Sequence, residues 1–423
     1  MKKKKFYLWI LGCQMNYSDA ERIITVFNNA GLSQTDQERD ADYIITIACS
    51  VRQTAIDRIF GKIKDWNKLK GQKKVSLILT GCVLEKDRQK LSKIFDLVFN
   101  IQDTAKLQEY LGEKKDSEKT PFFSLTPKYQ SKFRAYVPIS FGCNNFCSYC
   151  AVPYTRGPEK SRSEKEVIEE VKKLIDSRYK EITLLGQNVN SYGNDLGKKD
   201  SFTRLISKID KIPGNYRVYF YSNHPKDISN NLINVLPKLK HFPPYLHLPL
   251  QSGSDKIISA MNRHYTQTQY LNLVKKIKKK VPNITLTTDI IVGFPGETDE
   301  DFRETKKLME LIGFSMAFIA QYSPRPQTIS AKVSDNVPKT EKEKRFQMLT
   351  KVLAKNLEKE NARLVNKKME VLIDEVKKEN LYGRTGSYKV VEIPDNQQAN
   401  FLGQFVEIEI TGSNAWKLSG KIL

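Results

Sequence analysis

Three of the six cysteines of this chain lie in one short motif, FGCNNFCSYC (141–150), with the spacing C-x3-C-x2-C. Thiolates are soft ligands that select iron–sulfur clusters or zinc. A structural zinc ion needs four ligands, commonly from paired C-x2-C units, and this loop offers three. The chain's four histidines are distant from the loop and lack paired zinc spacing: His224, His241, His247 and His264. The motif therefore favours a cubane cluster held by Cys143, Cys147 and Cys150, with one iron left open.

The other three cysteines, Cys13, Cys49 and Cys82, each follow a segment that the apolar pattern predicts to be a strand. These segments are 5–11, 42–48 and 75–81, with a fourth candidate at 96–99. Helical stretches separate them, one opened by the capping box Ser18-Asp19-Ala20-Glu21 and running through Ala30, the other over about 52–69. Alternating strands and helices predict a parallel sheet, whose carboxyl ends share one edge. We therefore expect the three thiols to converge on that edge.

The first residues, MKKKKFYLWILGC, also resemble an export leader that ends at a cysteine. The apolar run is short for such a leader. Cleavage at Cys13 would delete the first strand of the predicted sheet, and Cys13 belongs to a set of three. We expect the first strand of a cytoplasmic domain here, and the alternative of three buried core cysteines is less favoured by their equivalent positions.

The segment after the central cysteines is predicted to be a partial barrel of strand–helix units. Ser163 and Glu166 form a capping box, and an apolar stripe follows on that helix. The six candidate strands are 136–140, 181–185, 217–221, 245–249, 285–292 and 316–321. Active residues are expected at the carboxyl ends of such strands, where GQN (186–188), SNH (222–224), QSGS (251–254) and GFPGE (293–297) lie. His224 and His247 are interpreted as structural histidines.

The composition favours a polyanionic partner. Lys and Arg number 70 and Asp and Glu 48, which gives a formal net charge of +22. Nucleic acid is the first candidate, and a generally lysine-rich proteome is the alternative. The length of 423 residues predicts two or three domains. No apolar run is long enough to span a bilayer, so no membrane partner is expected.

The segments on either side of the predicted strand–helix barrel differ from it in character. Residues 112–134 are polar and basic and are predicted to be a linker, and 340–368 a charged helix. Four short β segments follow without helices between them, which predicts a small closed barrel: 369–376, 382–392, 404–410 and 417–422. Such barrels bind RNA in some proteins and are purely structural in others.

Taken together, these motifs resemble those of the methylthiotransferases, which are radical S-adenosylmethionine (radical SAM) enzymes with a C-terminal RNA-binding TRAM domain. The resemblance covers the whole chain. Its marks are LGCQMN (11–16), ACSVR (48–52), TGCV (80–83), FGCNNFCSYCAVPYTRGPEKSR (141–162), LLGQNVNSYG (184–193), HLPLQSGSDKIISAMNRHYT (247–266), DIIVGFPGETDEDF (289–302), YSPRP (322–326) and GRTGSYKVV (383–391). The implied fold class is α/β: a parallel α/β sheet domain over 1–118, a partial (βα)6 radical SAM barrel over 129–359 and a small all-β TRAM barrel over 362–423.

The resemblance also implies the site. Cys143, Cys147 and Cys150 would hold a radical [4Fe-4S] cluster. Cys13, Cys49 and Cys82 would hold an auxiliary one. The residues implied to contact S-adenosylmethionine are Tyr149, Gly186, Gln187, Asn188, Gln251, Ser252, Arg263, Val292 and Gly293.

The sequence GQNVN (186–190) resembles the branch that acts on isopentenyladenosine at tRNA position 37, next to the anticodon. The implied reaction replaces the hydrogen on carbon 2 of the adenine with a methylthio group. Implied partners are the tRNA anticodon stem-loop, a ferredoxin- or flavodoxin-like reductant and a sulfur donor, for a monomeric cytoplasmic enzyme. The alternatives are a ribosomal-protein aspartate or threonylcarbamoyl-adenosine as acceptor, or a non-enzymatic RNA-binding Fe–S or zinc protein.

Three positions depart from the family pattern. Ile47-Ala48 replaces the usual Asn-Thr before Cys49, and Gln327 replaces the usual glycine after YSPRP. In the TRAM segment, the usual asparagine after GRT is replaced around Ser387-Tyr388. These departures affect local loops and RNA contacts rather than the clusters.

Overall fold

The structure is a computed structural model that describes residues 3–51, 53–112, 121–394 and 401–423. The chain divides into two compact units. Unit 1 comprises Met1–Ser131, Phe141–Arg162 and Ser323–Ala331. Unit 2 comprises Lys132–Ser140, Ser163–Tyr322 and Lys332–Leu423. The loop with Cys143, Cys147 and Cys150 is therefore part of the same compact unit as the N-terminal sheet.

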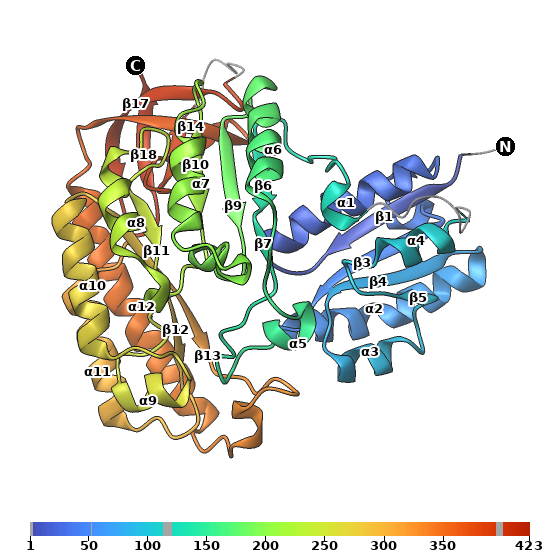
Figure 1. Cartoon of the computed structure of the whole chain (residues 1–423), viewed down its shortest axis with the longest axis horizontal. Helices are drawn as coiled ribbons and strands as arrows, with labels where there is room; N and C mark the ends of the chain where they lie inside the picture. The colour runs from blue at the N-terminus through green and yellow to red at the C-terminus, as the bar shows by residue number, and fades with distance from the viewer. Residues whose placement is uncertain (1–2, 52, 113–120, 395–400) are drawn as a thin grey trace. The chain divides into compact units, whose positions relative to one another are not determined.

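Unit 1 is built on a five-stranded sheet in the order β2-β1-β3-β4-β5, with every neighbouring pair parallel. This confirms the predicted parallel sheet (Figure 1). Its strands are β1 (Lys5–Ile10), β2 (Ser33–Gln34), β3 (Tyr43–Cys49), β4 (Ser76–Cys82) and β5 (Leu97–Val98). The central strands β3 and β4 are almost wholly buried, as expected when helices cover both faces of a parallel sheet.

The helices of unit 1 are α1 (Gln14–Asn29), α2 (Gln53–Gln72), α3 (Glu85–Leu91), α4 (Thr104–Tyr110) and α5 (Val152–Arg156). The predicted start of α1 at the Ser18 capping box is wrong, because Cys13 is the N-cap. The side chain of Asn16 folds back, and its Oδ1 accepts from the Cys13 N–H at 3.3 Å. Ser18 is instead buried inside the helix. Arg52, the expected start of the next helix, and residues 113–120 of the expected linker lie outside the described residues.

Unit 2 contains the six predicted barrel strands, arranged as two three-stranded parallel sheets in the orders β10-β9-β6 and β11-β12-β13. Their bounds are β6 (Arg134–Pro138), β9 (Glu181–Leu185), β10 (Arg217–Phe220), β11 (Tyr245–His247), β12 (Thr285–Val292) and β13 (Met316–Gln321). The short strands β7 (Ser140–Phe141) and β8 (Lys160–Ser161) flank the cysteine loop.

Helices separate the barrel strands in sequence: α6 (Glu164–Asp176), α7 (Ser201–Ile209), α8 (Asn230–Val235), α9 (Asp255–Ala260), α10 (Gln267–Lys280) and α11 (Asp299–Ile312). The long helix α12 (Lys339–Ala362) follows the last barrel strand, β13, and precedes the C-terminal barrel. The predicted Ser163 cap of α6 is confirmed, since its Oγ accepts from the Glu166 N–H. None of the helices in the described ranges is both long and apolar enough to cross a bilayer.

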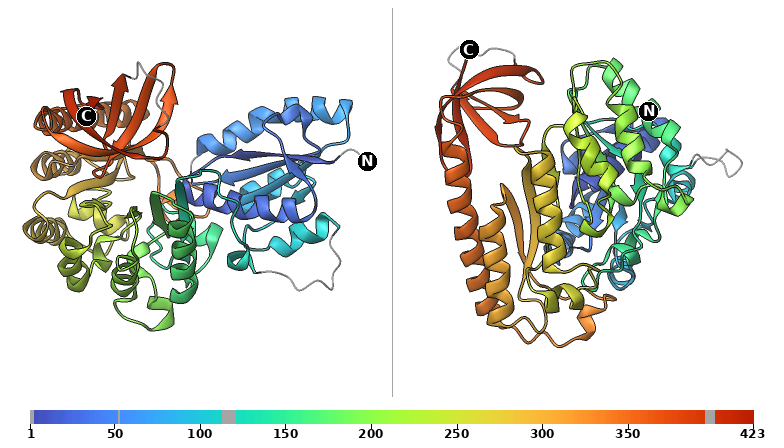
Figure 2. Two further views of the ribbon diagram at one scale, coloured as in Figure 1. Left: turned by 90° about the horizontal axis from the view of Figure 1, so that it is seen from above. Right: turned by 60° about the vertical axis from the view of Figure 1, so that its left-hand side comes forward.

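The C-terminal segment is a closed five-stranded barrel in the order β14-β15-β16-β18-β17, which confirms the expected closed all-β barrel (Figure 2). Its strands are β14 (Lys368–Lys377), β15 (Asn380–Thr385), β16 (Val390–Pro394), β17 (Phe405–Ser413) and β18 (Leu418–Ile422). The single β segment predicted over 382–392 is wrong, because a turn at 386–389 divides it into β15 and β16. Tyr388 in this turn has a φ of 64°.

Candidate active site

The structure brings the thiols of Cys13, Cys49 and Cys82 to one edge of the unit 1 sheet. Cys49 and Cys82 are direct partners in the register of β3 and β4, at their carboxyl ends. Cys13 caps α1 at the end of the neighbouring strand β1. A Cβ placed on Gly12 would lie 2.3 Å from Asn16 Oδ1 and 3.1 Å from Cys49 Cβ. The glycine is therefore needed for the close approach of these elements.

The side chain of Asn16 contacts the backbone at the Ile47-Ala48 departure. Asn16 Nδ2 donates to the Ala48 carbonyl oxygen at 3.3 Å. Ile47 and Ala48 themselves are fully buried in the sheet core. The departure thus leaves the strand ends fixed without the usual polar side chains.

Cys49 and Cys82 are buried, Cys13 is exposed, and the charge of Arg156 acts on all three thiols. Desolvation by the surrounding protein raises the pKa of Cys13, and the hydrogen bond with Cys49 and burial together raise that of Cys82. The same hydrogen bond lowers the pKa of Cys49. Arg156 Nε donates to Cys82 Sγ at 2.8 Å, and this contact favours the thiolate. Three thiols beside a buried arginine are a donor set that fits an iron–sulfur cluster.

Within the part of the chain that the structure describes, no three His, Cys, Asp or Glu side chains are gathered as ligands of one metal ion.

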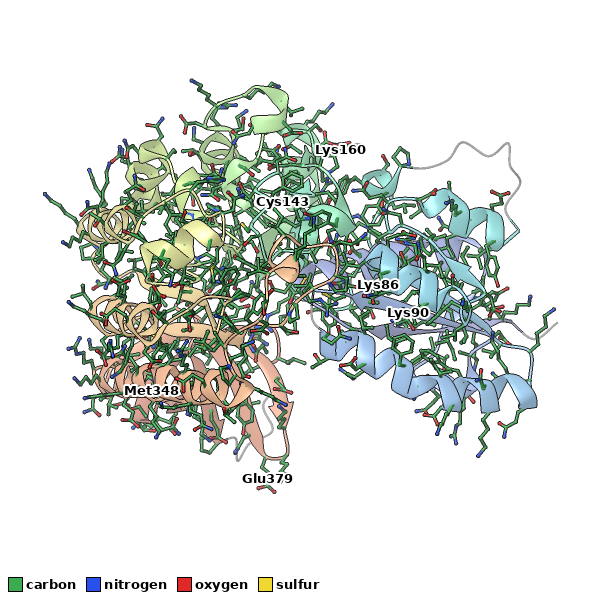
Figure 3. The ribbon with its side chains drawn as sticks, turned by 90° about the horizontal axis from the view of Figure 1, so that it is seen from below. Lys86, Lys90, Cys143, Lys160, Met348 and Glu379 are labelled. Atoms are coloured by element: carbon green, nitrogen blue, oxygen red, sulfur yellow. The ribbon has the colours of Figure 1, made fainter. Side chains whose placement is uncertain are left out.

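The second cysteine set lies on a loop shaped by backbone contacts (Figure 3). Gly142 has a φ of 77°, and a Cβ on it would lie 2.1 Å from the Pro158 carbonyl oxygen. The Cys143 N–H donates to the Gly157 carbonyl at 3.2 Å, and the Cys150 N–H to that of Cys147 at 2.9 Å. The loop is therefore tightly folded around Cys143, Cys147 and Cys150, and Tyr149 beside them is half-buried.

Residues 323–331 support the same loop. The Ser330 N–H donates to the Ser148 carbonyl at 2.8 Å. Gln327, the departure from the usual glycine, has a φ of 70°. A glycine adopts this left-handed conformation without steric strain, which explains why a glycine is usual at this position. In this chain a glutamine adopts it, at some cost in conformational strain.

In unit 2, polar side chains follow the carboxyl ends of three barrel strands. Gln187 and Asn188 follow β9, Asn223 follows β10 and Gln251 follows β11. Each has a buried side-chain oxygen with no hydrogen-bond partner among the described residues. Buried acceptors are rarely left unpaired. Their oxygens fit the hydrogen-bond donors of S-adenosylmethionine, which are its ammonium, ribose hydroxyl and adenine amine groups.

Glycines in three of the predicted loops serve close packing. A Cβ on Gly253 would lie 2.5 Å from Thr305 Cα, and the Thr305 Oγ1 is 3.3 Å from Ser252 Oγ. A Cβ on Gly293, which follows Val292 at the end of β12, would lie 2.3 Å from Lys342 Cγ. A Cβ on Gly186 would lie 2.6 Å from Ser140 Oγ.

Arg263 is placed differently from the other predicted contacts with S-adenosylmethionine. It is buried, and its Nη2 donates to the Pro249 carbonyl at 3.1 Å. In this structure it fixes the end of the β11 segment.

The sequence interpretation missed that His247 and Asp289 lie close together. His247 Nδ1 accepts from the Ser222 N–H at 3.3 Å, and its Nε2 lies 3.4 Å from Asp289 Oδ2 with no hydrogen-bond partner among the described residues. The signal was the alternation of β12, which places Asp289 on one face of a strand otherwise rich in β-branched residues. The Ser222 backbone therefore orients the His247 ring.

His224 is a buried neutral histidine. Burial, together with the charges of Arg263 and Lys226, lowers its pKa to about 2. Its Nδ1 accepts from the Lys226 N–H at 3.3 Å, and its Nε2 has no partner among the described residues.

We expect His224 to make stability fall as the pH falls below 6.5. The folded-state pKa is depressed, so the unfolded chain binds the proton first, and stability is present above the unfolded pKa and lost below it. His224 should lower the free energy of unfolding by about 1.4 kcal/mol between pH 7.5 and 5.5. Urea unfolding of the wild type and His224→Asn at both pH values measures this. An equal loss in both proteins contradicts the assignment.

The TRAM barrel packs against the amino ends of the barrel strands within unit 2. Tyr388 reaches between Tyr219 and Tyr245, with ring centroids 4.9 and 5.7 Å away, and its hydroxyl donates to Glu181 Oε1 at 3.0 Å. Arg217 pairs with Glu370 at 2.6 Å. Tyr388 thus closes the end of the barrel where the strands begin, which we call the barrel floor. This end is opposite the strand ends that carry Gln187 and Gln251.

We expect Tyr388→Phe to lower the free energy of unfolding by about 1.5–3 kcal/mol, because it removes a hydrogen bond to a buried carboxylate. Tyr382→Phe is the matched control, since the Tyr382 hydroxyl donates to Glu392 Oε1 on the exposed side of the TRAM barrel. Urea unfolding followed by circular dichroism compares them. The assignment is wrong when the two substitutions have equal effects.

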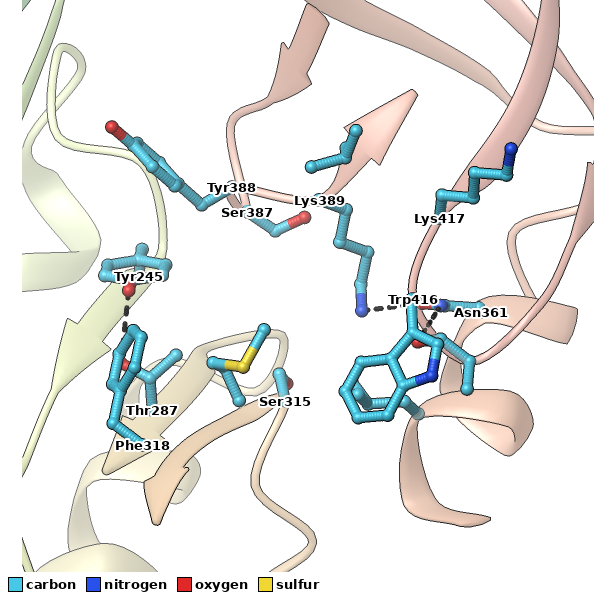
Figure 4. Close-up of a pocket in the computed structure, with 14 residues that line it drawn as sticks. Tyr245, Thr287, Ser315, Phe318, Asn361, Ser387, Tyr388, Lys389, Trp416 and Lys417 are labelled. Carbon is cyan, nitrogen blue, oxygen red and sulfur yellow. Dashed lines mark hydrogen bonds between the residues drawn. The ribbon is translucent and has the colours of Figure 1, made fainter. Parts of the chain in front are cut away.

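A cavity of about 120 Å³ lies beside this floor (Figure 4). Phe318 and Trp416 line it and are about half exposed, at 56% and 54%. Lys389 also lines it, and its Nζ donates to Asn361 Oδ1 at 2.8 Å. The cavity therefore offers aromatic faces next to a cation.

Comparison with known proteins finds three family matches along the chain. The Radical SAM superfamily matches residues 137–309, the "Uncharacterized protein family UPF0004" residues 5–101, and the TRAM domain residues 362–423. The tRNA-2-methylthio-N(6)-dimethylallyladenosine synthase of Acetivibrio thermocellus is 39% identical, and the match covers 100% of this chain and 92% of that protein. The chain belongs to the radical SAM methylthiotransferase family. The synthase of the same name from Clostridium novyi is 38% identical, over 99% of this chain and 97% of that protein.

Solved structures show the same fold at low identity. The radical S-adenosylmethionine methyltransferase TsrM from Kitasatospora setae superposes with a TM-score of 0.58 at 12% identity, covering 78% of this chain and 77% of that one. For a methylthiotransferase of the radical SAM superfamily, a [4Fe-4S] cluster and S-adenosylmethionine are the implied cofactors.

Proposed function

We propose that this methylthiotransferase acts on tRNA and inserts a methylthio group at carbon 2 of isopentenyladenosine at position 37. The observation that carries the proposal is the full-length similarity to synthases named for that nucleoside, at 38–39% identity. The enzyme would act in the cytoplasm as a monomer, with a ferredoxin- or flavodoxin-like reductant and a separate sulfur donor.

The proposed cofactors are two [4Fe-4S] clusters and S-adenosylmethionine. Cys143, Cys147 and Cys150 would hold the radical cluster, and Cys13, Cys49 and Cys82 the auxiliary one. Support comes from the arrangement of the thiols, because all six cysteines of the chain fall into these two sets. The proposed domains are 1–118, 129–359 and 362–423.

When bound, the radical cluster and S-adenosylmethionine supply a radical that removes the hydrogen from carbon 2. The chain's own residues bind and orient S-adenosylmethionine. Gln187, Asn188 and Gln251 offer buried acceptor oxygens for the amine and hydroxyl donors of S-adenosylmethionine. Tyr149, Gly186, Ser252, Arg263, Val292 and Gly293 complete the proposed binding set.

The choice of nucleoside rests on the resemblance of GQNVN (186–190) to the isopentenyladenosine branch and on the names of the relatives. Within this sequence Asn188 Nδ2 donates to Asp227 Oδ2 at 2.7 Å. An aspartate at 188 would instead place two carboxylates against each other.

The proposed surface for the anticodon stem-loop includes the TRAM barrel. A groove of about 840 Å³ in unit 2 is lined by many basic residues, among them Arg217, Lys278, Arg363 and Lys368, against two acidic ones, Glu360 and Glu370. Basic residues neutralise phosphates, and the aromatic rings of the neighbouring cavity suit base stacking. The net charge of +22 agrees with such a partner.

Nucleoside analysis of tRNA from a deletion strain tests the function. We expect 2-methylthio-isopentenyladenosine to be lost, isopentenyladenosine to accumulate, and the gene to restore the modification. Unchanged tRNA together with loss of a modified ribosomal protein would instead support the protein-acceptor alternative. Anaerobic isolation tests the cluster count, since two cubanes give about eight irons per chain. A colourless protein with one zinc ion would refute the assignment as a radical SAM enzyme.

A further inference from the structure

Arg156 connects the two cysteine sets within unit 1. It ends α5, the short helix that follows Cys150 in the radical loop. Its guanidinium nevertheless contacts the other set, because Nε donates to Cys82 Sγ at 2.8 Å. The loop that carries the radical-cluster ligands thus also supplies a cation to the sulfur at the end of β4.

The position of this guanidinium is fixed from three sides. Nη2 pairs with Asp19 Oδ2 at 2.6 Å, and both side chains are essentially buried, with exposed fractions of 1% and 0%. The guanidinium also stacks over the Phe141 ring, 4.6 Å from its centroid. Nη1 is buried and has no hydrogen-bond partner among the described residues, which leaves one donor for a further acceptor.

A buried ion pair of this kind is not explained by stability alone. Two charges lose their hydration when they are buried, and an apolar pair of similar volume is often as stable. The ion pair with Asp19 holds the Arg156 side chain in place. The planar guanidinium has several N–H donors, so it can pair with a carboxylate and donate to sulfur at the same time. These features suit a residue that holds a charge beside a thiolate.

We propose that Arg156 is a positioning residue for the auxiliary cluster: held by Asp19, it donates to the Cys82 sulfur and raises the reduction potential of that cluster. The proposal rests on the proposed function, which provides the second cluster. Donated hydrogen bonds and positive charge stabilise the more negative, reduced state of an iron–sulfur cluster. Because the site is buried, solvent ions screen this effect little.

The test is a redox titration of the anaerobically prepared holoenzyme, followed by electron paramagnetic resonance. Adding S-adenosylmethionine changes the signal of the radical cluster, so the unresponsive signal is that of the auxiliary cluster. Arg156→Gln should shift the auxiliary midpoint to a more negative potential and leave the radical cluster's midpoint in place. Arg156→Lys should give a smaller shift, since the positive charge remains while the planar guanidinium and its several N–H donors are lost.

Two further variants separate this effect from a general loss of structure. Arg156→Gln combined with Asp19→Asn avoids an unpaired buried carboxylate and should show the same negative shift. Arg162→Gln is the matched control, since Arg162 is also a buried arginine at the end of the same loop, with its guanidinium over Phe123. It should leave both midpoints unchanged.

The outcomes distinguish the two levels of the proposal. A wild type with one cluster signal would refute the two-cluster function itself. Two wild-type signals with an auxiliary midpoint unchanged in Arg156→Gln and in the double variant would overturn only the role of Arg156. Equal shifts of both clusters, or a shift in Arg162→Gln as large as in Arg156→Gln, would also overturn it.

Discussion

Replacement of Cys143 by alanine is expected to reduce the formation of 5′-deoxyadenosine from S-adenosylmethionine to the level of a reaction without protein. Cys147→Ala and Cys150→Ala should do the same, because each thiolate holds one corner of the proposed radical cluster. The cofactors carry this chemistry, and the protein contributes the ligands that retain them. Chromatographic quantification of 5′-deoxyadenosine with dithionite as reductant measures the effect.

Cys49→Ala is the matched control for this prediction. It also removes a buried thiol from unit 1, but from the other cysteine set. We expect it to keep substantial cleavage of S-adenosylmethionine. The assignment of the radical set is refuted when any of the three loop variants still forms 5′-deoxyadenosine at the wild-type rate.

Much of the fold was predictable because local patterns and tertiary structure agree. The apolar runs before Cys49 and Cys82 are buried on both faces, and only a covered parallel sheet provides that environment. The capping box at Ser163 operates as predicted because both of its contacts lie within one helical turn. The closed C-terminal barrel followed from β segments that have no helices between them.

The two wrong boundaries have different causes, one local and one tertiary. Ser18 and Glu21 form a plausible capping box, but Cys13 and Asn16 cap α1 one turn earlier. The segment 382–392 has a continuous β pattern, and only its contact with the barrel floor explains the left-handed Tyr388 that breaks it. A pattern of residue types does not contain such contacts.

The site was predictable to the extent that spacing encodes it. The cysteines of the loop and of the strand ends could be identified from their positions. Arg156 could not, because its contacts with Asp19 and Cys82 join residues far apart in the sequence. The orientation of His247 toward Asp289 likewise depends on two different strands.

Cys13→Ala is expected to separate the two halves of the reaction. Cys13 lies at the end of β1, beside Cys49 and Cys82, while the radical ligands belong to a different loop. Loss of its thiol should remove the auxiliary cluster and lower the iron content by about half, from two cubanes to one. Cleavage of S-adenosylmethionine should survive, and methylthio insertion into tRNA should fall to background, because the sulfur would pass through the lost cluster.

The control for this variant must remove a neighbouring group without removing a ligand. Asn16→Ala serves, because Asn16 accepts from the Cys13 N–H and donates to the Ala48 carbonyl but contributes no thiolate. It should weaken the cap of α1, at a cost of about 0.5–2 kcal/mol in stability, and keep most of the iron. Iron content, 5′-deoxyadenosine formation and the modified nucleosides of tRNA are measured for the wild type, Cys13→Ala and Asn16→Ala. Normal methylthiolation by Cys13→Ala would make Cys13 an ordinary core thiol. The strand-end cysteines would then share an edge of the sheet without sharing a cluster.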